Sequence, residues 1–133
     1  MALLKGDGGF PTNESLLGRR EAGGTTAPLI YPSTYLACTI DCAWYLELHP
    51  LGPSRTRLVH GALFPKDRLA RNDFEDVVQR YYKRWDISIP EDNEISDIQQ
   101  RGLSSPFARP GRLTHLEPLV HDLANWVLDR VLD

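Results

Sequence analysis

The pattern of hydrophobic and polar positions changes period along the chain, and this change separates predicted strands from predicted helices. Residues 33–64 are rich in Tyr, Thr, Val, Ile and Leu, and they contain turn signals at Ile40-Asp41 and at 50–54, where Gly and two Pro break a strand. The pattern therefore predicts an antiparallel meander of three strands, at about 33–39, 42–49 and 54–64.

After residue 72 the apolar positions follow the period of a helix. Large apolar side chains recur at spacings of three, four, seven, eight and eleven from Phe74. The members of this stripe are Phe74, Val77, Val78, Tyr81, Tyr82 and Trp85. They predict one face of an amphipathic helix that Pro90 ends. We interpret the stripe as core, with one or two members reaching a pocket, because its burial would contribute several kcal/mol.

Two further helices are predicted towards the C-terminus. One begins near Glu91, with acids in its first turns where the helix dipole favours negative charge, and ends before Gly102. After a loop at 103–112, the capping box Thr114-His115-Leu116-Glu117 opens the last helix, and Pro118 is tolerated in its first turn. Its apolar stripe consists of Leu116, Leu119, Val120, Leu123, Val127 and Val131.

The order of strands followed by helices predicts the α+β class, with about three antiparallel strands packed by two or three helices. Residues 1–30 hold most of the glycines and form a loop-rich lead-in with at most a short helical turn around Asn13–Arg20. We interpret residues 1–133 as a single partial domain, with strands at 31–65 and helices at 72–133.

Composition excludes several classes of function. A net charge of −3 does not favour a polyanionic partner such as nucleic acid. The apolar run in the opening segment is too short for a signal peptide or a membrane span, so a cytoplasmic location is expected. Cys38 and Cys42 form neither a disulfide framework nor a metal-finger spacing, and we expect both to be reduced. No nucleophile elbow and no phosphate-binding loop is present in the sequence.

Several short phrases occur in a specific order. They are Leu29-Ile30-Tyr31-Pro32-Ser33, Leu48-His49-Pro50-Leu51-Gly52-Pro53-Ser54-Arg55-Thr56-Arg57, Phe74-Glu75-Asp76, Glu91-Asp92-Asn93-Glu94, Gln99-Gln100-Arg101-Gly102-Leu103 and Arg109-Pro110-Gly111-Arg112-Leu113. Together they resemble the C-terminal catalytic region of the alpha (large) subunit of Rieske-type aromatic-ring-hydroxylating oxygenases. The branch that includes choline- and carnitine-type monooxygenases and phenylpropionate-type dioxygenases looks closest. The resemblance runs from about Gly9 to the C-terminus.

This resemblance implies a helix-grip catalytic domain with mononuclear Fe(II) on a 2-His-1-carboxylate triad. The family's carboxylate ligand falls on Asp92; without the resemblance, Asp92 reads as an acid in the first turn of a helix. The implied reaction is dioxygen-dependent hydroxylation of an aromatic or quaternary-amine-type substrate. Electrons would come from a separate reductase through a Rieske [2Fe–2S] cluster. The family is usually homo-oligomeric and trimer-like.

The sequence lacks most residues of that metal apparatus. It contains neither Cys-x-His nor Cys-x-x-His, and it has no closely spaced pair of histidines. His49 and His60 are expected on adjacent strands, where they could approach each other and could line the iron pocket, although sheet packing is favoured. His115 and His121, six apart on the predicted last helix, make a poor metal pair.

Two hypotheses follow. In the first, the chain is a truncated alpha subunit that begins at an internal methionine or a false start. It is missing the N-terminal Rieske and catalytic portion and is not expected to be active alone, so no catalytic and no cofactor-binding residue is assigned. In the second, it is a non-enzymatic helix-grip module that binds an apolar ligand or a partner subunit.

Overall fold

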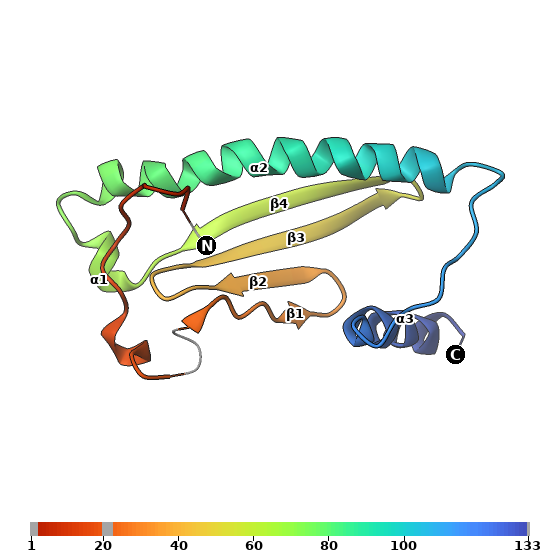
Figure 1. Ribbon diagram of the computed structural model, residues 1–133, viewed down its shortest axis with the longest axis horizontal. Helices are drawn as coiled ribbons and strands as arrows, with labels where there is room; N and C mark the ends of the chain where they lie inside the picture. Colours follow the sequence, from red (N-terminus) through yellow and green to blue (C-terminus); the bar gives the residue numbers. More distant parts are fainter. Residues whose placement is uncertain (1–2, 20–22, 133) are drawn as a thin grey trace.

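The chain forms an antiparallel sheet accompanied by helices, as the α+β prediction requires (Figure 1). A computed structural model describes residues 3–19 and 23–132. The sheet has the order β1-β2-β3-β4, with β1 at Leu29–Ile30, β2 at Thr34–Cys38, β3 at Ala43–Gly52 and β4 at Arg55–Leu63. The three predicted strands are confirmed. The short β1, which pairs Leu29 with Tyr35, was not predicted.

The β3–β4 hairpin is longer than its sequence predicts. Pro50 still pairs with Thr56, and Gly52 pairs with Arg55, so that only Pro53 and Ser54 form the turn. The register shifts between Pro50 and Gly52, and an irregularity of this kind accommodates a residue that cannot donate to the ladder. The expectation that Pro50 and Gly52 would end the strand was therefore wrong.

Helix α2 spans Phe74–Leu103 without interruption, although Pro90 lies inside it. The predicted stop at Pro90 and the separate helix from Glu91 were wrong, and the helix also passes Gly102 by one residue. A proline removes one helical hydrogen bond, which does not end a helix that has regular turns on both sides and runs beside a long hairpin (Figure 1). The acids at Glu91 and Asp92 are consequently in the middle of a helix, so the dipole argument does not apply to them.

The last helix, α3, spans Pro118–Val131 and begins later than predicted. The Thr114 N–H donates to Glu117 Oε2 at 2.8 Å, and the Leu116 N–H donates to Thr114 Oγ1 at 3.3 Å. These contacts close a turn before the helix. Pro118 is tolerated in the first helical turn, because a backbone N–H at that position would have no hydrogen-bond partner within the helix. His115 therefore lies outside α3.

The remaining helices are short. Helix α1 spans Lys66–Leu69, and the 3₁₀ helix η1 spans Glu14–Leu16. The helical turn expected around Asn13–Arg20 is thus present as η1, while Arg20 itself lies outside the described residues. No helix in the described part of the chain combines the length and apolarity that a bilayer crossing needs.

The core lies between one end of the sheet and the N-terminal half of α2. Its buried residues are Phe10, Cys42, Trp44, Val77, Val78 and Tyr81. Phe74 and Trp85 pack against this cluster, which confirms the predicted helix face except for Tyr82, whose exposed fraction is 41%. In contrast, no residue of α3 is buried among those described, so the apolar stripe predicted for that helix is largely open.

A hydrogen-bond network around Tyr81 joins three distant segments. The Tyr81 hydroxyl donates to Asp41 Oδ2 at 2.5 Å and accepts from the Phe10 N–H at 2.8 Å. Thr39 Oγ1 donates to Asp41 Oδ1 at 2.8 Å. Burial, reinforced by the hydrogen bond to Asp41, raises the pKa of Tyr81 above its usual value, so the phenol remains protonated and donates.

Gly9 is the position where this network is most sensitive to added volume. A Cβ at Gly9 would lie 2.4 Å from Tyr81 Oη and 2.6 Å from Leu3 Cδ1. We expect Gly9→Ala to lower the free energy of unfolding by about 1–3 kcal/mol, measured by urea denaturation, because the phenol must move. Gly24→Ala is the matched control, since a Cβ there meets nothing within 4 Å. Equal stability of the two variants would contradict the packing described.

Pro90 provides a second test of the fold. In a continuous α2, Pro90→Ala restores a helical N–H and relieves a clash with the preceding turn, so it should raise the free energy of unfolding by about 1–3 kcal/mol. Pro118→Ala in the first turn of α3 should change it by less than about 0.5 kcal/mol, because proline is tolerated there. An effect of Pro90→Ala no larger than that of Pro118→Ala would contradict a continuous helix.

Candidate functional site

A hollow lies between the C-terminal half of α2 and the β3–β4 hairpin, and we call it the hairpin groove. It has a volume of about 670 Å³. Its sheet wall consists of Leu48, Pro53, Ser54, Arg55, Thr56, Leu58 and His60. Its helix wall consists of Ile89, Asp92, Asn93, Ser96, Asp97 and Gln100.

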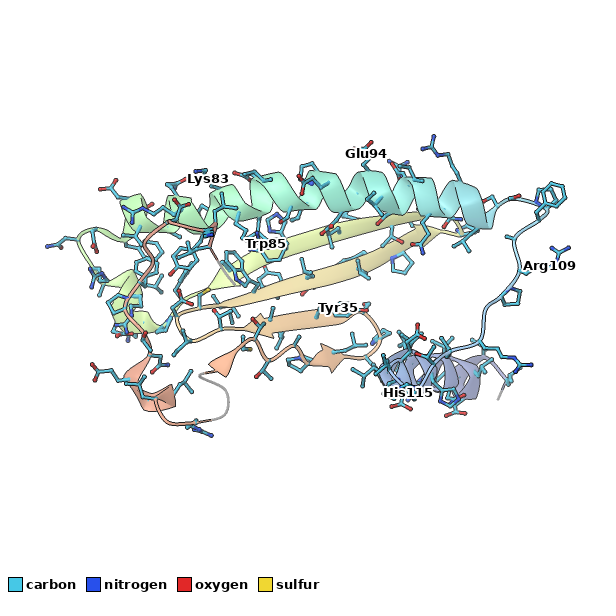
Figure 2. The ribbon with its side chains drawn as sticks, viewed as in Figure 1. Tyr35, Lys83, Trp85, Glu94, Arg109 and His115 are labelled. Carbon is cyan, nitrogen blue, oxygen red and sulfur yellow. The ribbon has the colours of Figure 1, made fainter. Side chains whose placement is uncertain are left out.

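Strand register places the sheet wall of the groove. Leu48 pairs with Leu58 and Leu46 pairs with His60, so these side chains share the face of Trp44, which packs against α2. On the helix, residues 89, 93, 96 and 100 are spaced by four, three and four and therefore form one stripe. Figure 2 shows Trp85 directed from α2 towards the sheet, whereas Lys83 and Glu94 lie on the outer side of the helix.

Asp92 lies in the helix wall of the groove. Its backbone carbonyl accepts a hydrogen bond from Ser96 Oγ at 2.8 Å. Within residues 3–19 and 23–132, its carboxylate forms no hydrogen bond and no ion pair. The residue is exposed to the groove rather than buried, so its carboxylate remains accessible to a bound group.

The four histidines are spread over separate surfaces. His60 faces the groove, with its ring 6.0 Å from that of Trp85. His49 pairs with Arg57 and contacts Glu47 at 3.1 Å on the opposite face of the sheet, so the expected approach of His49 to His60 was wrong. Arg57, the partner of His49, lies three residues before His60 on β4. Because side chains alternate along a strand, this odd separation places the two imidazole rings on opposite faces of the sheet.

Neither of the two C-terminal histidines is in the groove. His121 lies on α3 near Asn125 at 3.1 Å, and His115 precedes the helix.

The donors of the groove do not complete a metal site on their own. Asp92, Asp97 and His60 are its acidic and imidazole side chains. Among the described residues, no three His, Cys, Asp or Glu side chains are grouped closely enough to hold a metal ion. The Asp92 carboxylate suits iron(II) as one hard, anionic ligand, but the set around it does not fit a whole iron centre.

The sequence reasoning missed Arg55 as a groove residue. Arg55 begins β4 directly after the Pro53-Ser54 turn and lines the groove opposite residues of the C-terminal half of α2. Alternation along β4 groups Thr56, Leu58 and His60 on the groove face but places Arg55 on the other face, so the strand pattern does not identify Arg55 as a groove residue. The predicted strand at 54–64 already contained these residues. The groove could not be predicted because the helix was expected to end at Pro90, whereas α2 continues beside the hairpin.

A smaller cavity of about 270 Å³ lies at the β2–β3 turn. Cys38, Thr39, Asp41 and Cys42 line it, and both cysteines are free, as expected. Burial raises the pKa of the Cys42 thiol to about 12, and the Cys42 Sγ is 3.3 Å from Thr39 Oγ1. A protonated, hydrogen-bonded thiol is a poor nucleophile, so this cavity has a structural rather than a catalytic character.

Comparison with known proteins gives a consistent result. The sequence model of the family described as ring hydroxylating alpha subunit (catalytic domain) matches residues 12–133. The chain is 27% identical, over 127 residues, to the glycine betaine monooxygenase oxygenase subunit of Chromohalobacter salexigens. The alignment covers 93% of this chain and 28% of that protein, so the chain spans less than a third of the relative's length. No solved structure matches significantly.

Thiol labelling tests the environment of the turn. At pH 8, a Cys38→Ser variant, which retains only Cys42, should react with a thiol reagent at least about tenfold more slowly than a Cys42→Ser variant, because Cys42 is buried and protonated. The rate for Cys42 should keep rising from pH 8 to pH 10, since its thiolate forms towards pH 12. In urea the two variants should react alike; equal rates in the native state would contradict the burial of Cys42.

Proposed function

Because the chain belongs to the ring-hydroxylating alpha subunit family, within the catalytic domain, we propose that it forms the C-terminal part of a Rieske-type non-haem iron oxygenase alpha subunit. In this proposal Asp92 is the carboxylate ligand of the mononuclear iron. The observation that carries the proposal is the position of Asp92, with an unpaired carboxylate, in a groove between the long helix and the sheet. The apolar neighbours Leu48, Leu58 and Ile89 support such a site, because they would form part of a hydrophobic shell around the metal once the exposed groove is covered.

The remaining ligands would come from the rest of the alpha subunit. Among residues 3–19 and 23–132 no three His, Cys, Asp or Glu side chains are grouped closely enough to hold a metal ion, and the sequence contains no Cys-x-His or Cys-x-x-His motif for a cluster. The two iron-binding histidines and the [2Fe–2S] cluster are therefore assigned to the portion of the family's alpha subunit that this chain does not span. A separate reductase would deliver electrons in the cytoplasm, and the assembly would be a homo-oligomer.

Exposed apolar side chains support docking with that portion. At the distal end of α2 and in the loop that follows, Ile95, Leu103 and Phe107 have exposed fractions of 65%, 63% and 86%. Helix α3 exposes further residues, namely Leu119, Val120, Val127, Leu128 and Val131. Exposed apolar side chains in this number mark an interface, and the remainder of the helix-grip domain is the proposed occupant.

The proposed reaction is dioxygen-dependent hydroxylation of a small organic substrate. By its name, the relative from Chromohalobacter salexigens acts on glycine betaine. A quaternary-amine-type substrate is therefore proposed first, and an aromatic substrate second. The iron, when bound, would activate dioxygen, while the groove residues of this chain would bind and orient the substrate beside Asp92.

A non-enzymatic module is the competing function. The absence of a three-ligand group among the described residues favours it, whereas the mixed lining of the groove, with Arg55, Asp92 and Asp97, is poorly suited to a purely apolar ligand. The two functions differ in their dependence on the Asp92 carboxylate, since a module that binds no metal does not need it.

Substitution of Asp92 tests the proposal. In an intact alpha subunit that carries this segment, Asp92→Asn should lower iron content to a small fraction of the unsubstituted level and abolish turnover, because the amide is neutral and a weaker ligand. Iron content would be measured by elemental analysis and turnover by oxygen consumption. Glu91→Gln is the matched control, because Glu91 is the adjacent acid and lies outside the groove lining. Full iron occupancy in Asp92→Asn would contradict the assignment.

A further inference from the structure

Four aromatic rings form a continuous series that runs from the hairpin groove into the core. The ring of His60, which lines the groove, lies 6.0 Å from that of Trp85. The Trp85 ring lies 4.9 Å from that of Trp44, and the Trp44 ring lies 6.1 Å from that of Tyr81. These separations are those of rings in direct packing contact. The series therefore connects two indoles and a phenol, the aromatic side chains that lose an electron most readily.

Trp85 is the indole of this series that an oxidant in the groove reaches first. It is half-buried and directed from α2 towards the sheet (Figure 2), whereas Trp44 is only 3% exposed. The indole N–H groups of both residues are buried and have no hydrogen-bond acceptor within the described part of the chain. An oxidised indole whose N–H has no acceptor keeps its proton and remains a radical cation. Such a cation takes an electron from a neighbouring ring more readily than a neutral indolyl radical does.

Tyr81, at the inner end of the series, can release a proton together with an electron. Its hydroxyl donates to Asp41 Oδ2 at 2.5 Å and accepts from the Phe10 N–H at 2.8 Å. Thr39 Oγ1 holds the other carboxylate oxygen of Asp41 at 2.8 Å. Among the tyrosines that the structure describes, only Tyr81 donates to a carboxylate. A phenol that loses an electron becomes strongly acidic, so an acceptor in a short hydrogen bond receives the proton without rearrangement.

From this arrangement we propose that Tyr81 is a redox-active tyrosine, which loses its electron to an oxidised Trp85 and its proton to Asp41. A diffusible inorganic or oxygen-derived radical first removes one electron from the Trp85 indole and is itself reduced. One electron then passes from Tyr81 through Trp44 to Trp85, while the Oη–H bond of Tyr81 breaks and an O–H bond forms on Asp41. The products are a neutral indole, a phenoxyl radical and a carboxylic acid. The radical cation and the carboxylate thus cancel, which is favourable in a core of low dielectric constant.

The inference goes beyond the proposed function, because the transfer requires neither iron nor a substrate. Asp41 is half-buried and lines the cavity at the β2–β3 turn, so the proton that it receives can exchange with water. If dioxygen is used in the groove, as proposed above, the ring series would carry oxidising equivalents away from the residues that line it.

A second contact between a tryptophan and a tyrosine serves as an internal comparison. The rings of Tyr31 and Trp126 lie 5.5 Å apart, but no carboxylate in the described part of the chain accepts from the Tyr31 hydroxyl. Because the sequence contains three tryptophans, Trp126→Phe leaves Trp44 and Trp85 as the remaining indoles. This variant isolates the core series and is the parent for the test.

The test is pulse radiolysis of the 133-residue chain carrying Trp126→Phe, with azide radicals as the oxidant that attacks tryptophan selectively. The absorption of the tryptophanyl radical should decay while that of the tyrosyl radical rises. The rate of this rise should be independent of protein concentration, because the transfer is intramolecular. It should be lower in D₂O than in H₂O, because an O–H bond breaks during the transfer.

Three further substitutions in that parent test the assigned roles. Tyr81→Phe, Asp41→Asn and Trp44→Phe should each lower the rate of tyrosyl formation at least about tenfold, because they remove the electron donor, the proton acceptor and the connecting indole. Tyr82→Phe is the matched control, since Tyr82 is the adjacent tyrosine, is 41% exposed and lies outside the ring series. It should leave the rate unchanged.

Equal rates of tyrosyl formation in Tyr81→Phe and Tyr82→Phe would overturn the inference, as would an unchanged rate in Asp41→Asn. Circular dichroism would check that each variant keeps its fold. The measurements in D₂O and at several protein concentrations need no substitution in the core, so they decide the question even if Tyr81→Phe does not fold. Equal rates in H₂O and D₂O, or a rate proportional to protein concentration, would also overturn it.

Discussion

The hydrogen bonds of the buried Tyr81 hydroxyl hold the described structure together. Tyr81 has no exposed surface, and its hydroxyl connects the carboxylate of Asp41 at the β2–β3 turn with the backbone of Phe10 in the lead-in. The ring of Phe10 then lies between those of Phe74 and Tyr81, at 5.5 and 5.4 Å. Because a buried phenol and a carboxylate are costly when unpaired, this network fixes α2 to the sheet in one orientation.

The hydrogen-bond network of Tyr81 also determines which residues of α2 face the hairpin. Asp92 follows Tyr81 by eleven residues, close to three full turns of a helix with about 3.6 residues per turn. Trp85 and Asp92 are separated by seven residues, close to two turns. The face that packs at Tyr81 therefore reappears at Asp92, provided that the helix continues through Pro90. A stop at Pro90 would have left the direction of Asp92 undetermined.

Strands and the buried helix face could be predicted from the sequence because each depends on a local period. The wrong predictions are element ends placed at prolines, where tertiary packing outweighs the local tendency of proline to end a helix or strand. Pro90 breaks one hydrogen bond but not a helix that extends along a hairpin, and Pro50 is accommodated at a register shift. The groove could be predicted only in part: the position of Asp92 came from a family resemblance, whereas Arg55 and His60 line the groove only because α2 continues past Pro90 beside the hairpin.

Burial falls steadily from one end of α2 to the other, and this gradient links stability to the proposed site. Val77, Val78 and Tyr81 are buried, whereas Ile95 and Ile98 have exposed fractions of 65% and 48%. The anchored end can therefore keep its geometry without the support of the distal end, where the groove and its unpaired charges lie. In the proposed alpha subunit, the same distal surface would acquire both its apolar cover and the remaining iron ligands. Assembly and metal binding would then depend on one interface, because the carboxylate of Asp92 and the exposed isoleucines lie on the same helix segment.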